Sequence, residues 1–153
     1  MHLTQWSDYS LRVLMYCATH QTRPNAPTIG EIIEAHGLSK SHVTKIVMTL
    51  SAAGYLSTTR GRGGGLRLMR SPDQINLGDV IRQTEPHFNL VECFDSITNQ
   101  CVITGNCKLK GVLMQARQKF LFELDQIWLS DLVRPPSATK IRMPPPTRAR
   151  VSP

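Results

Sequence analysis

The sequence predicts a mainly α-helical fold with a small β-hairpin wing, in which a winged helix-turn-helix domain is followed by a long helix suited to dimerisation. Three observations support this prediction. Two short segments with helical apolar spacing are joined by a four-residue link that contains glycine, which is typical of a helix-turn-helix. A basic glycine-rich turn then separates two strand-forming runs. Finally, a stripe of apolar residues at helical spacing lies near the C-terminus.

Capping residues mark the first three helices, which we predict over residues 7–19, 29–36 and 40–53. Ser7 is placed to cap the first helix, because a serine hydroxyl accepts a hydrogen bond from a free amide at a helix start. Thr28 and Glu31 have the spacing of a capping box at the start of the second helix, and Gly37 suits its end. Ser39 is placed to cap the third helix.

The wing is predicted from two strand-forming runs, 55–59 and 66–69, on either side of the turn RGRGGG at 60–65. Further along, we expect a short helix over 77–84 and a long amphipathic helix over about 108–130. A single long amphipathic helix late in a small chain often pairs with a copy of itself. We favour such a homodimer over packing of this helix across its own N-terminal domain.

Charge divides the chain into three parts. Residues 1–70 carry eight Lys or Arg and three Asp or Glu, whereas residues 71–133 carry five and eight. Residues 134–153 carry five basic side chains, no acidic one and six prolines. Together with the predicted elements, this gives a winged helix-turn-helix domain over 1–75, a cluster-binding loop and dimerisation helix over 76–133, and a disordered tail rich in Pro and Arg over 134–153.

The chain is expected in the cytoplasm. It contains no run of about 20 apolar residues that would span a membrane. The N-terminal residues MHLTQWSDYS lack the basic and apolar regions of a secretory signal. Cytoplasmic thiols stay reduced, so the cysteines are better interpreted as metal ligands or redox groups than as disulfides.

The basic N-terminal part predicts a polyanionic partner, and the helix-turn-helix predicts double-stranded DNA, with the second helix entering the major groove by its N-terminal residues. The candidate contacts at the starts of the helices predicted over 29–36 and 40–53 are Thr28, Ser39, Lys40, Ser41, His42 and Lys45. The polar side of the second of these helices continues with Thr44, Met48 and Thr49. Arg60 and Arg62 on the wing are expected to contact DNA as well, because arginine is attracted into a narrow minor groove.

An enzyme is disfavoured. The turn RGRGGG lacks the following Lys-Ser/Thr of a phosphate-binding P-loop and precedes a strand instead of a helix. No convergent pair of nucleophile and base stands out in the sequence either.

Three of the four cysteines, Cys93, Cys101 and Cys107, lie within 15 residues of irregular sequence. They lack the C-x₂-C pairs typical of zinc sites, whereas wider spacings are compatible with an iron–sulfur cluster. A cluster is favoured, and a zinc site and unligated thiols stay open as alternatives. A four-ligand site would then need one further ligand from another residue, a partner subunit or an exogenous molecule. Cys17, on the apolar face of the first helix, is expected in the core.

Several motifs together resemble the bacterial iron–sulfur winged-helix repressor family that includes IscR: MHLTQWSDYSLRVLMY, GLSKSHVTKIVMTLSAAGYL, RGRGGGLRL, INLGDVIRQTEP and C-x₇-C-x₅-C followed by KLKGVL. The resemblance covers about residues 1–133 and is closest to the nitric-oxide-sensitive branch. It implies a homodimeric repressor that binds a palindromic operator and releases it when nitric oxide nitrosylates or removes the cluster. Two alternatives are a regulator of the same fold that senses iron–sulfur or redox status, and a zinc or thiol switch without a cluster.

The resemblance also implies the ligands of the cluster. Cys93, Cys101 and Cys107 match the family's three cysteine ligands, and in the nitric-oxide-sensitive branch a carboxylate from the other subunit completes the site. Asp8 stands at that position, and a [4Fe-4S] cluster is favoured over [2Fe-2S]. Members like IscR use a histidine three residues after the last cysteine, where this chain has Lys110. If Asp8 is a ligand, it ties the sensor of one subunit to the DNA-binding domain of the other.

Overall fold

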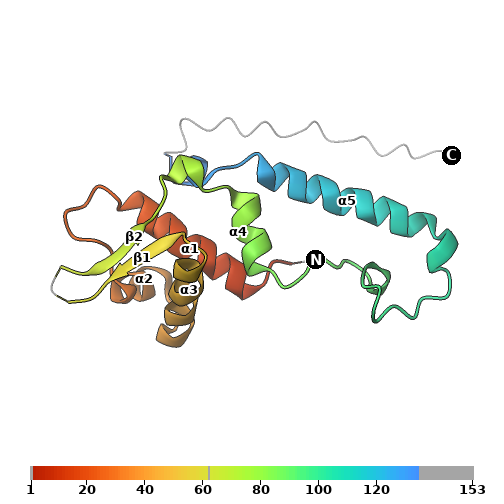
Figure 1. Ribbon diagram of the computed structural model, residues 1–153, viewed down its shortest axis with the longest axis horizontal. Coiled ribbons are helices and arrows are strands. Elements are labelled where there is room, and N and C mark those ends of the chain that lie inside the picture. Colours follow the sequence, from red (N-terminus) through yellow and green to blue (C-terminus); the bar gives the residue numbers. More distant parts are fainter. Residues whose placement is uncertain (1, 62, 135–153) are drawn as a thin grey trace.

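The computed structural model describes residues 2–61 and 63–134, which form six α-helices, a two-stranded antiparallel hairpin and three short 3-10 turns (Figure 1). The N-terminal elements are α1 (Gln5–Thr19), α2 (Ile29–His36), α3 (Lys40–Ala52), β1 (Leu56–Thr59) and β2 (Gly65–Leu68). The later elements are η1 (Pro72–Gln74), α4 (Leu77–Thr84), η2 (Glu92–Phe94), η3 (Thr104–Asn106), α5 (Lys108–Asp125) and α6 (Leu129–Val133). This mainly helical fold with a hairpin wing confirms the predicted fold class. The predicted disorder of 135–153 lies outside the described residues.

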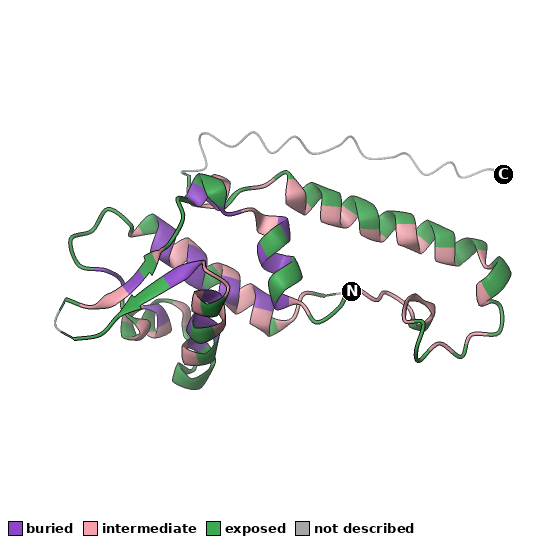
Figure 2. Cartoon of the chain, in the orientation of Figure 1, coloured by how far each residue is buried: buried purple, intermediate pink, exposed green. Residues whose placement is uncertain are grey.

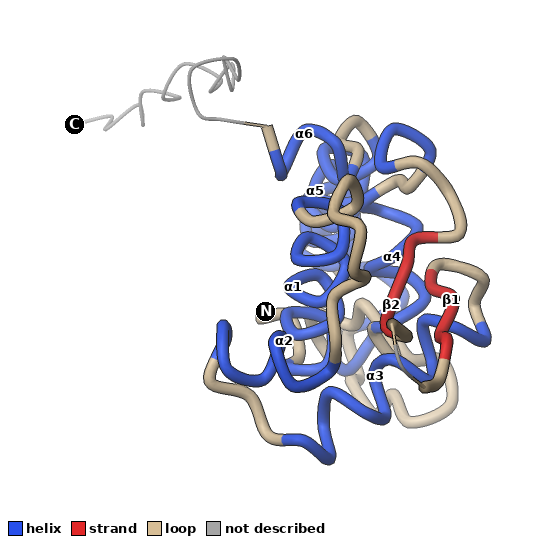
Figure 3. Tube along the Cα trace, turned by 90° about the vertical axis from the view of Figure 1, so that its left-hand side faces the viewer, coloured by secondary structure: helices blue, strands red, loops and turns tan. Residues whose placement is uncertain are grey.

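One hydrophobic core joins the helix-turn-helix, the hairpin and the helices that follow it. Its fully or almost fully buried members include Val13, Leu14, Ile32, Val43, Ile46, Leu50, Leu56, Leu66, Ile75, Val80 and Leu129. Each such aliphatic side chain contributes about 1.5–3 kcal/mol by leaving water. The core therefore fixes α3 in place, and α3 lies on the side of the domain opposite α6 (Figures 1 and 3).

The second and third helices begin and end where local chemistry predicts. Thr28 and Glu31 form a reciprocal capping box, and Gly37 ends α2 in the left-handed conformation at φ 63°. That conformation is costly for residues with a Cβ, which is why glycine suits it. Ser39 caps α3, whose last residue is Ala52, one residue earlier than expected.

The predicted start of the first helix is wrong. The helix begins at Gln5 and is capped by Thr4, not by Ser7. The Thr4 hydroxyl accepts a hydrogen bond from the Ser7 amide at 3.3 Å and donates to a Glu85 carboxylate oxygen at 3.0 Å. Ser7 is buried, with its hydroxyl 2.8 Å from that of Thr84 in α4. Contacts with residues about 80 positions away therefore decide where α1 starts.

The sequence predicted one helix over 108–130, but the structure divides this segment into α5 and the short α6. The chain leaves helical geometry after Asp125, and the Ile127 carbonyl then accepts a hydrogen bond from the Leu77 amide at 2.9 Å. The Leu129 amide donates to the Ile75 carbonyl, also at 2.9 Å. The break turns Leu129 into the core, where its side chain is only 2% exposed.

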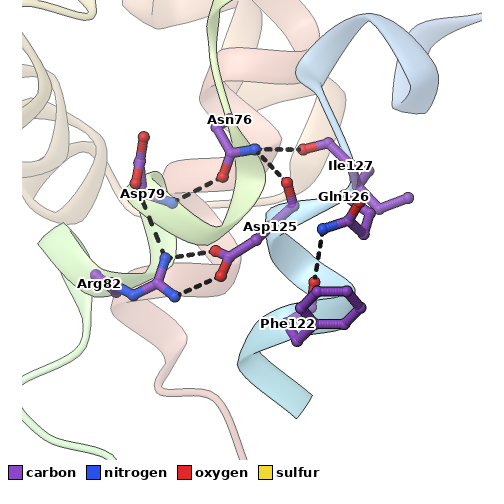
Figure 4. Close-up of polar contacts among 7 residues, drawn as sticks. All are labelled: Asn76, Asp79, Arg82, Phe122, Asp125, Gln126 and Ile127. Atoms are coloured by element: carbon purple, nitrogen blue, oxygen red, sulfur yellow. Dashed lines mark hydrogen bonds and ion pairs between the residues drawn. The ribbon is translucent and has the colours of Figure 1, made fainter. Parts of the chain in front are cut away.

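An ion pair fastens the end of α5 to α4 (Figure 4). Both terminal nitrogens of Arg82 donate to the Asp125 carboxylate, at 2.5 and 2.8 Å. The hydrogen bond from Arg82 holds the pKa of Asp125 below its ordinary value. Asn76 adds a hydrogen bond of 2.8 Å from its side-chain amide to the Asp125 carbonyl. We call Asn76, Arg82 and Asp125 the α4–α5 junction.

The rest of the C-terminal half extends away from the core as an arm (Figures 1 and 2). Between residues 85 and 128, all of which the structure describes, no side chain is buried. Several large apolar side chains of this arm are more than half exposed: Ile97, Val102, Ile103, Leu109, Val112 and Phe122. Ordinary monomers leave few such groups together in water, so the arm has the composition of a surface that a partner covers.

Candidate nucleic-acid interface and cysteine segment

The core determines which face α3 presents to solvent. Val43, Ile46, Val47 and Leu50 point inward and are at most 3% exposed. The opposite face carries the exposed residues Lys40, Ser41, His42, Lys45 and Met48. The structure therefore brings the predicted contact residues of this helix together on one accessible surface.

Two of the predicted contact residues already have structural roles as helix caps. The Ser39 hydroxyl accepts a hydrogen bond from the His42 amide at 3.3 Å. The Thr28 hydroxyl accepts one from the Glu31 amide at 3.2 Å, and the Thr28 amide donates to the Glu31 carboxylate at 2.7 Å. That backbone hydrogen bond, with a second from Arg23, lowers the pKa of Glu31. Contact of Thr28 or Ser39 with DNA stays a prediction.

A groove of about 590 Å³ separates α3 from the hairpin. Its walls come from the start of α2, the middle of α3 and the tip of the hairpin, and include Thr28, Thr44, Met48, Thr58 and Arg60. Arg60 is exposed at the mouth of the groove, whereas Arg62 lies outside the described residues. The groove places a basic wing beside the exposed face of α3.

A close backbone approach holds the wing against the loop before α2. The Leu66 amide donates to the Pro27 carbonyl at 2.8 Å. A Cβ atom on Gly65 would lie 2.6 Å from that carbonyl oxygen and 2.7 Å from the Ala26 carbonyl oxygen. Glycine is therefore required at position 65 for this approach, a contact that the sequence analysis did not predict.

The three cysteines of the arm differ from the fourth in their surroundings. Cys93, Cys101 and Cys107 are free and partly exposed, whereas Cys17 is free and buried in the core as predicted. Burial raises the pKa of Cys17 to about 12. Cys17 is therefore a small apolar side chain of the core, packed with Val13, Leu14 and Ala18 in the same hydrophobic cluster.

Local contacts hold the backbone near each of these cysteines. Cys107 is the N-cap of α5, and its sulfur accepts a hydrogen bond from the Lys110 amide at 3.4 Å. Asn99 accepts a hydrogen bond from the Cys101 amide at 3.1 Å. Arg117 of α5 lies 4.7 Å from the centre of the Phe94 ring, which ties the turn next to Cys93 to that helix.

Three thiols suit an iron–sulfur cluster in their chemistry, but the structure does not bring Cys93, Cys101 and Cys107 together into one site. Among residues 2–61 and 63–134, no three side chains of His, Cys, Asp or Glu gather closely enough to hold a metal ion. Asp8 belongs to the first turn of α1, and both of its carboxylate oxygens accept hydrogen bonds from Arg12, at 3.0 and 2.9 Å. The sequence prediction missed Arg12, although its spacing of four residues from Asp8 on a helix is the signal of such an ion pair.

A helix-turn-helix with a glycine-rich basic wing is the architecture of winged-helix DNA-binding proteins, and the described residues of this chain have that architecture.

In the part of the chain that the structure describes, no helix is both long and apolar enough to cross a membrane.

Comparison with known proteins defines the family. A family model described as "Rrf2: Iron-dependent Transcriptional regulator" matches residues 3–135, and the chain belongs to this family of transcriptional regulators. The HTH-type transcriptional regulator NsrR of Bacillus subtilis (strain 168) is 47% identical over 135 residues, which cover 88% of this chain and 91% of NsrR. NsrR of Geobacillus kaustophilus (strain HTA426) is 41% identical over 133 residues, covering 87% and 90%.

Solved structures support the same fold at lower identity. IscR of T. potens has a TM-score of 0.69 and 23% identity, and the match covers 95% of this chain and 93% of IscR. CymR, the global cysteine regulator of B. subtilis, has a TM-score of 0.70 and 23% identity, covering 87% and 96%. At this identity the likeness establishes the fold alone.

Proposed function

We propose that this chain is a homodimeric transcriptional repressor that binds a palindromic operator and senses nitric oxide through an iron–sulfur cluster. One observation carries the proposal: three free, partly exposed thiols lie on an arm that has no buried side chain and that follows a winged helix-turn-helix. The similarity to NsrR over nearly the whole chain supports it.

The exposed residues of α3 would dock in the major groove. Lys40 and Lys45 are suited to phosphate oxygens, and Ser41 and His42 can reach phosphates or base edges. Arg60 would enter the adjacent minor groove from the wing. Phosphate contacts position such a domain, while contacts to base edges specify its sequence.

The apolar residues of α5 would supply the subunit interface. Leu109 and Val112 are each 62% exposed, and Phe122 is 59% exposed. Covering these side chains with the same helix of a second copy would remove them from water, which favours association. A two-fold dimer also matches a palindromic operator, because each half-site then meets an equivalent α3.

Cys93, Cys101 and Cys107 would hold the cluster, with Asp8 of the second subunit as the fourth ligand and a [4Fe-4S] form favoured over [2Fe-2S]. When bound, a cluster with one non-cysteine ligand supplies a site that reacts with nitric oxide. To serve as a ligand, Asp8 must give up its ion pair with Arg12 for a bond to the cluster. Both side chains are more than 40% exposed, and exposed ion pairs stabilise proteins little, so this exchange has a small cost.

Anaerobic purification and absorption spectroscopy test the proposal directly. We expect a coloured, iron-containing protein that shifts operator DNA and releases it when nitric oxide is added. A colourless, zinc-containing protein under strict anaerobiosis would contradict the cluster. A coloured protein that keeps its DNA in nitric oxide would contradict the signal but not the cofactor.

Replacement of Arg60 by alanine is expected to weaken DNA binding about tenfold per subunit and to lower the slope of log affinity against log salt by about one per subunit, hence about two for the dimer. The reason is the loss of one cationic contact beside the groove from each subunit. Binding isotherms at several salt concentrations measure both quantities. Arg70→Ala is the matched control, because Arg70 is exposed but stacks over Tyr55, with its guanidinium 5.5 Å from that ring centre. Equal losses in the two variants would show a general charge effect and argue against a wing contact.

Replacement of Asp8 by alanine is expected to leave iron on the three cysteines but to uncouple nitric oxide from DNA release. Iron content and DNA shift with and without nitric oxide measure the two effects. Arg12→Ala is the control, since it removes the same ion pair and keeps the carboxylate, and it should respond normally. A normal nitric oxide response in the Asp8 variant would rule out this coupling role.

A further inference from the structure

Met48 is an apolar side chain on the polar, DNA-facing side of α3. It is 68% exposed, whereas the nearest apolar residues on either side of it in the sequence, Val47 and Leu50, are at most 3% exposed. Lys45, one turn earlier on the same face, is also exposed. Neither the core nor a neighbouring side chain explains why a large apolar group occupies this position.

The surroundings of Met48 indicate what it faces. It lines the groove between α3 and the hairpin together with Thr44, Thr58 and Arg60. These neighbours offer hydroxyl groups and a cation, which are partners for a nucleic acid. Under the proposed function, a duplex therefore lies across this groove, with the base edges of its major groove toward α3.

In the major groove, the one apolar group that a base pair presents is the 5-methyl group of thymine. We propose that Met48 recognises a thymine by packing against this methyl group, and so sets the sequence preference of the repressor at one position of each half-site. This inference rests on the proposed DNA-binding function and adds a specificity-determining residue to it. Methionine suits the task because its unbranched, flexible side chain adapts to irregular apolar surfaces.

The test removes the methyl group from the DNA and the thioether from the protein. Duplexes are first selected from a random library with the wild-type dimer, and each thymine is then replaced in turn by uracil, which lacks only the methyl group. For the wild type, we expect one position in each half-site at which uracil weakens binding about fourfold, the effect of exposing one methyl group. For Met48→Ala, uracil at that position should have no effect, because the two changes are coupled.

Two further variants make the outcome specific. Met48→Leu should keep the sensitivity to uracil, because leucine is also apolar and of similar size. Met69→Ala is the matched control, since Met69 is 60% exposed but lies outside the groove, and it should keep the full sensitivity.

Two results would overturn the inference alone: a wild-type protein that tolerates uracil at every position, or a Met48→Ala protein as sensitive as the wild type. A dimer that selects no duplex at all would overturn the proposed function, and this inference with it.

Discussion

Replacement of Cys101 by serine is expected to abolish stable iron binding and to leave DNA affinity unaffected by nitric oxide. A serine hydroxyl does not ionise near neutral pH, so the site would lose one of its three thiolates. The fold of the segment should survive, because its hydrogen bonds here use the backbone. Asn99 accepts from the amide of residue 101 at 3.1 Å, and Thr104 donates to its carbonyl at 2.8 Å.

Iron analysis, absorption spectra and DNA shift with nitric oxide measure this loss, for which we expect less than a tenth of the wild-type iron. Cys17→Ala is the control, because it removes a thiol with a raised pKa of about 12 from the core. That variant should keep its iron and its response while losing some stability. Full iron content in the Cys101 variant would refute the ligand assignment.

Replacement of Gly65 by alanine is expected to destabilise the domain by about 1–3 kcal/mol or more, the range for forcing atoms into a well-packed site. The added Cβ would lie within 2.8 Å of three atoms of Ala26 and Pro27, of which two are backbone carbonyl oxygens. Backbone cannot rotate away as a flexible side chain can. The hairpin would have to separate from the loop before α2, with the loss of the hydrogen bond between Leu66 and Pro27.

Urea unfolding of the wild type and the variant measures the change. Gly30→Ala is the control, because a Cβ there has no neighbour closer than the Thr28 hydroxyl at 3.8 Å. Alanine is favoured over glycine in helices by up to about 1 kcal/mol, so this variant should be as stable as the wild type or more so. A Gly65→Ala protein with unchanged stability would contradict the close approach.

The features that the sequence predicts well are those decided by neighbouring residues. Thr28 with Glu31, Gly37 and Ser39 are caps that act within four positions of themselves, and all of them appear where expected. The face of α3 follows from apolar spacing for the same reason. Such patterns need no knowledge of the tertiary structure.

The features that sequence reasoning missed depend on distant residues. Thr4 caps α1 because Glu85 fixes it, and the long helix stops after Asp125 because the following residues bond to the segment before α4. No local sequence pattern predicts either contact. The cluster site stays a prediction, because its proposed fourth ligand, Asp8, would come from a second subunit and the three cysteines do not gather in one chain.

The α4–α5 junction has a geometric consequence for a dimer held through α5. The 18 residues of that helix span about 27 Å, and the bidentate pair between Arg82 and Asp125 sets its angle to the DNA-facing domain. For a helix of this length, a tilt of about 10° at the junction displaces its opposite end by roughly 5 Å. Two recognition helices must stand about 34 Å apart to fit successive major grooves. In the proposed dimer, the ion pair and the hydrogen bonds of Asn76, Leu77 and Leu129 would together limit how far a change among the cysteines moves the two α3 helices away from the spacing that the duplex requires.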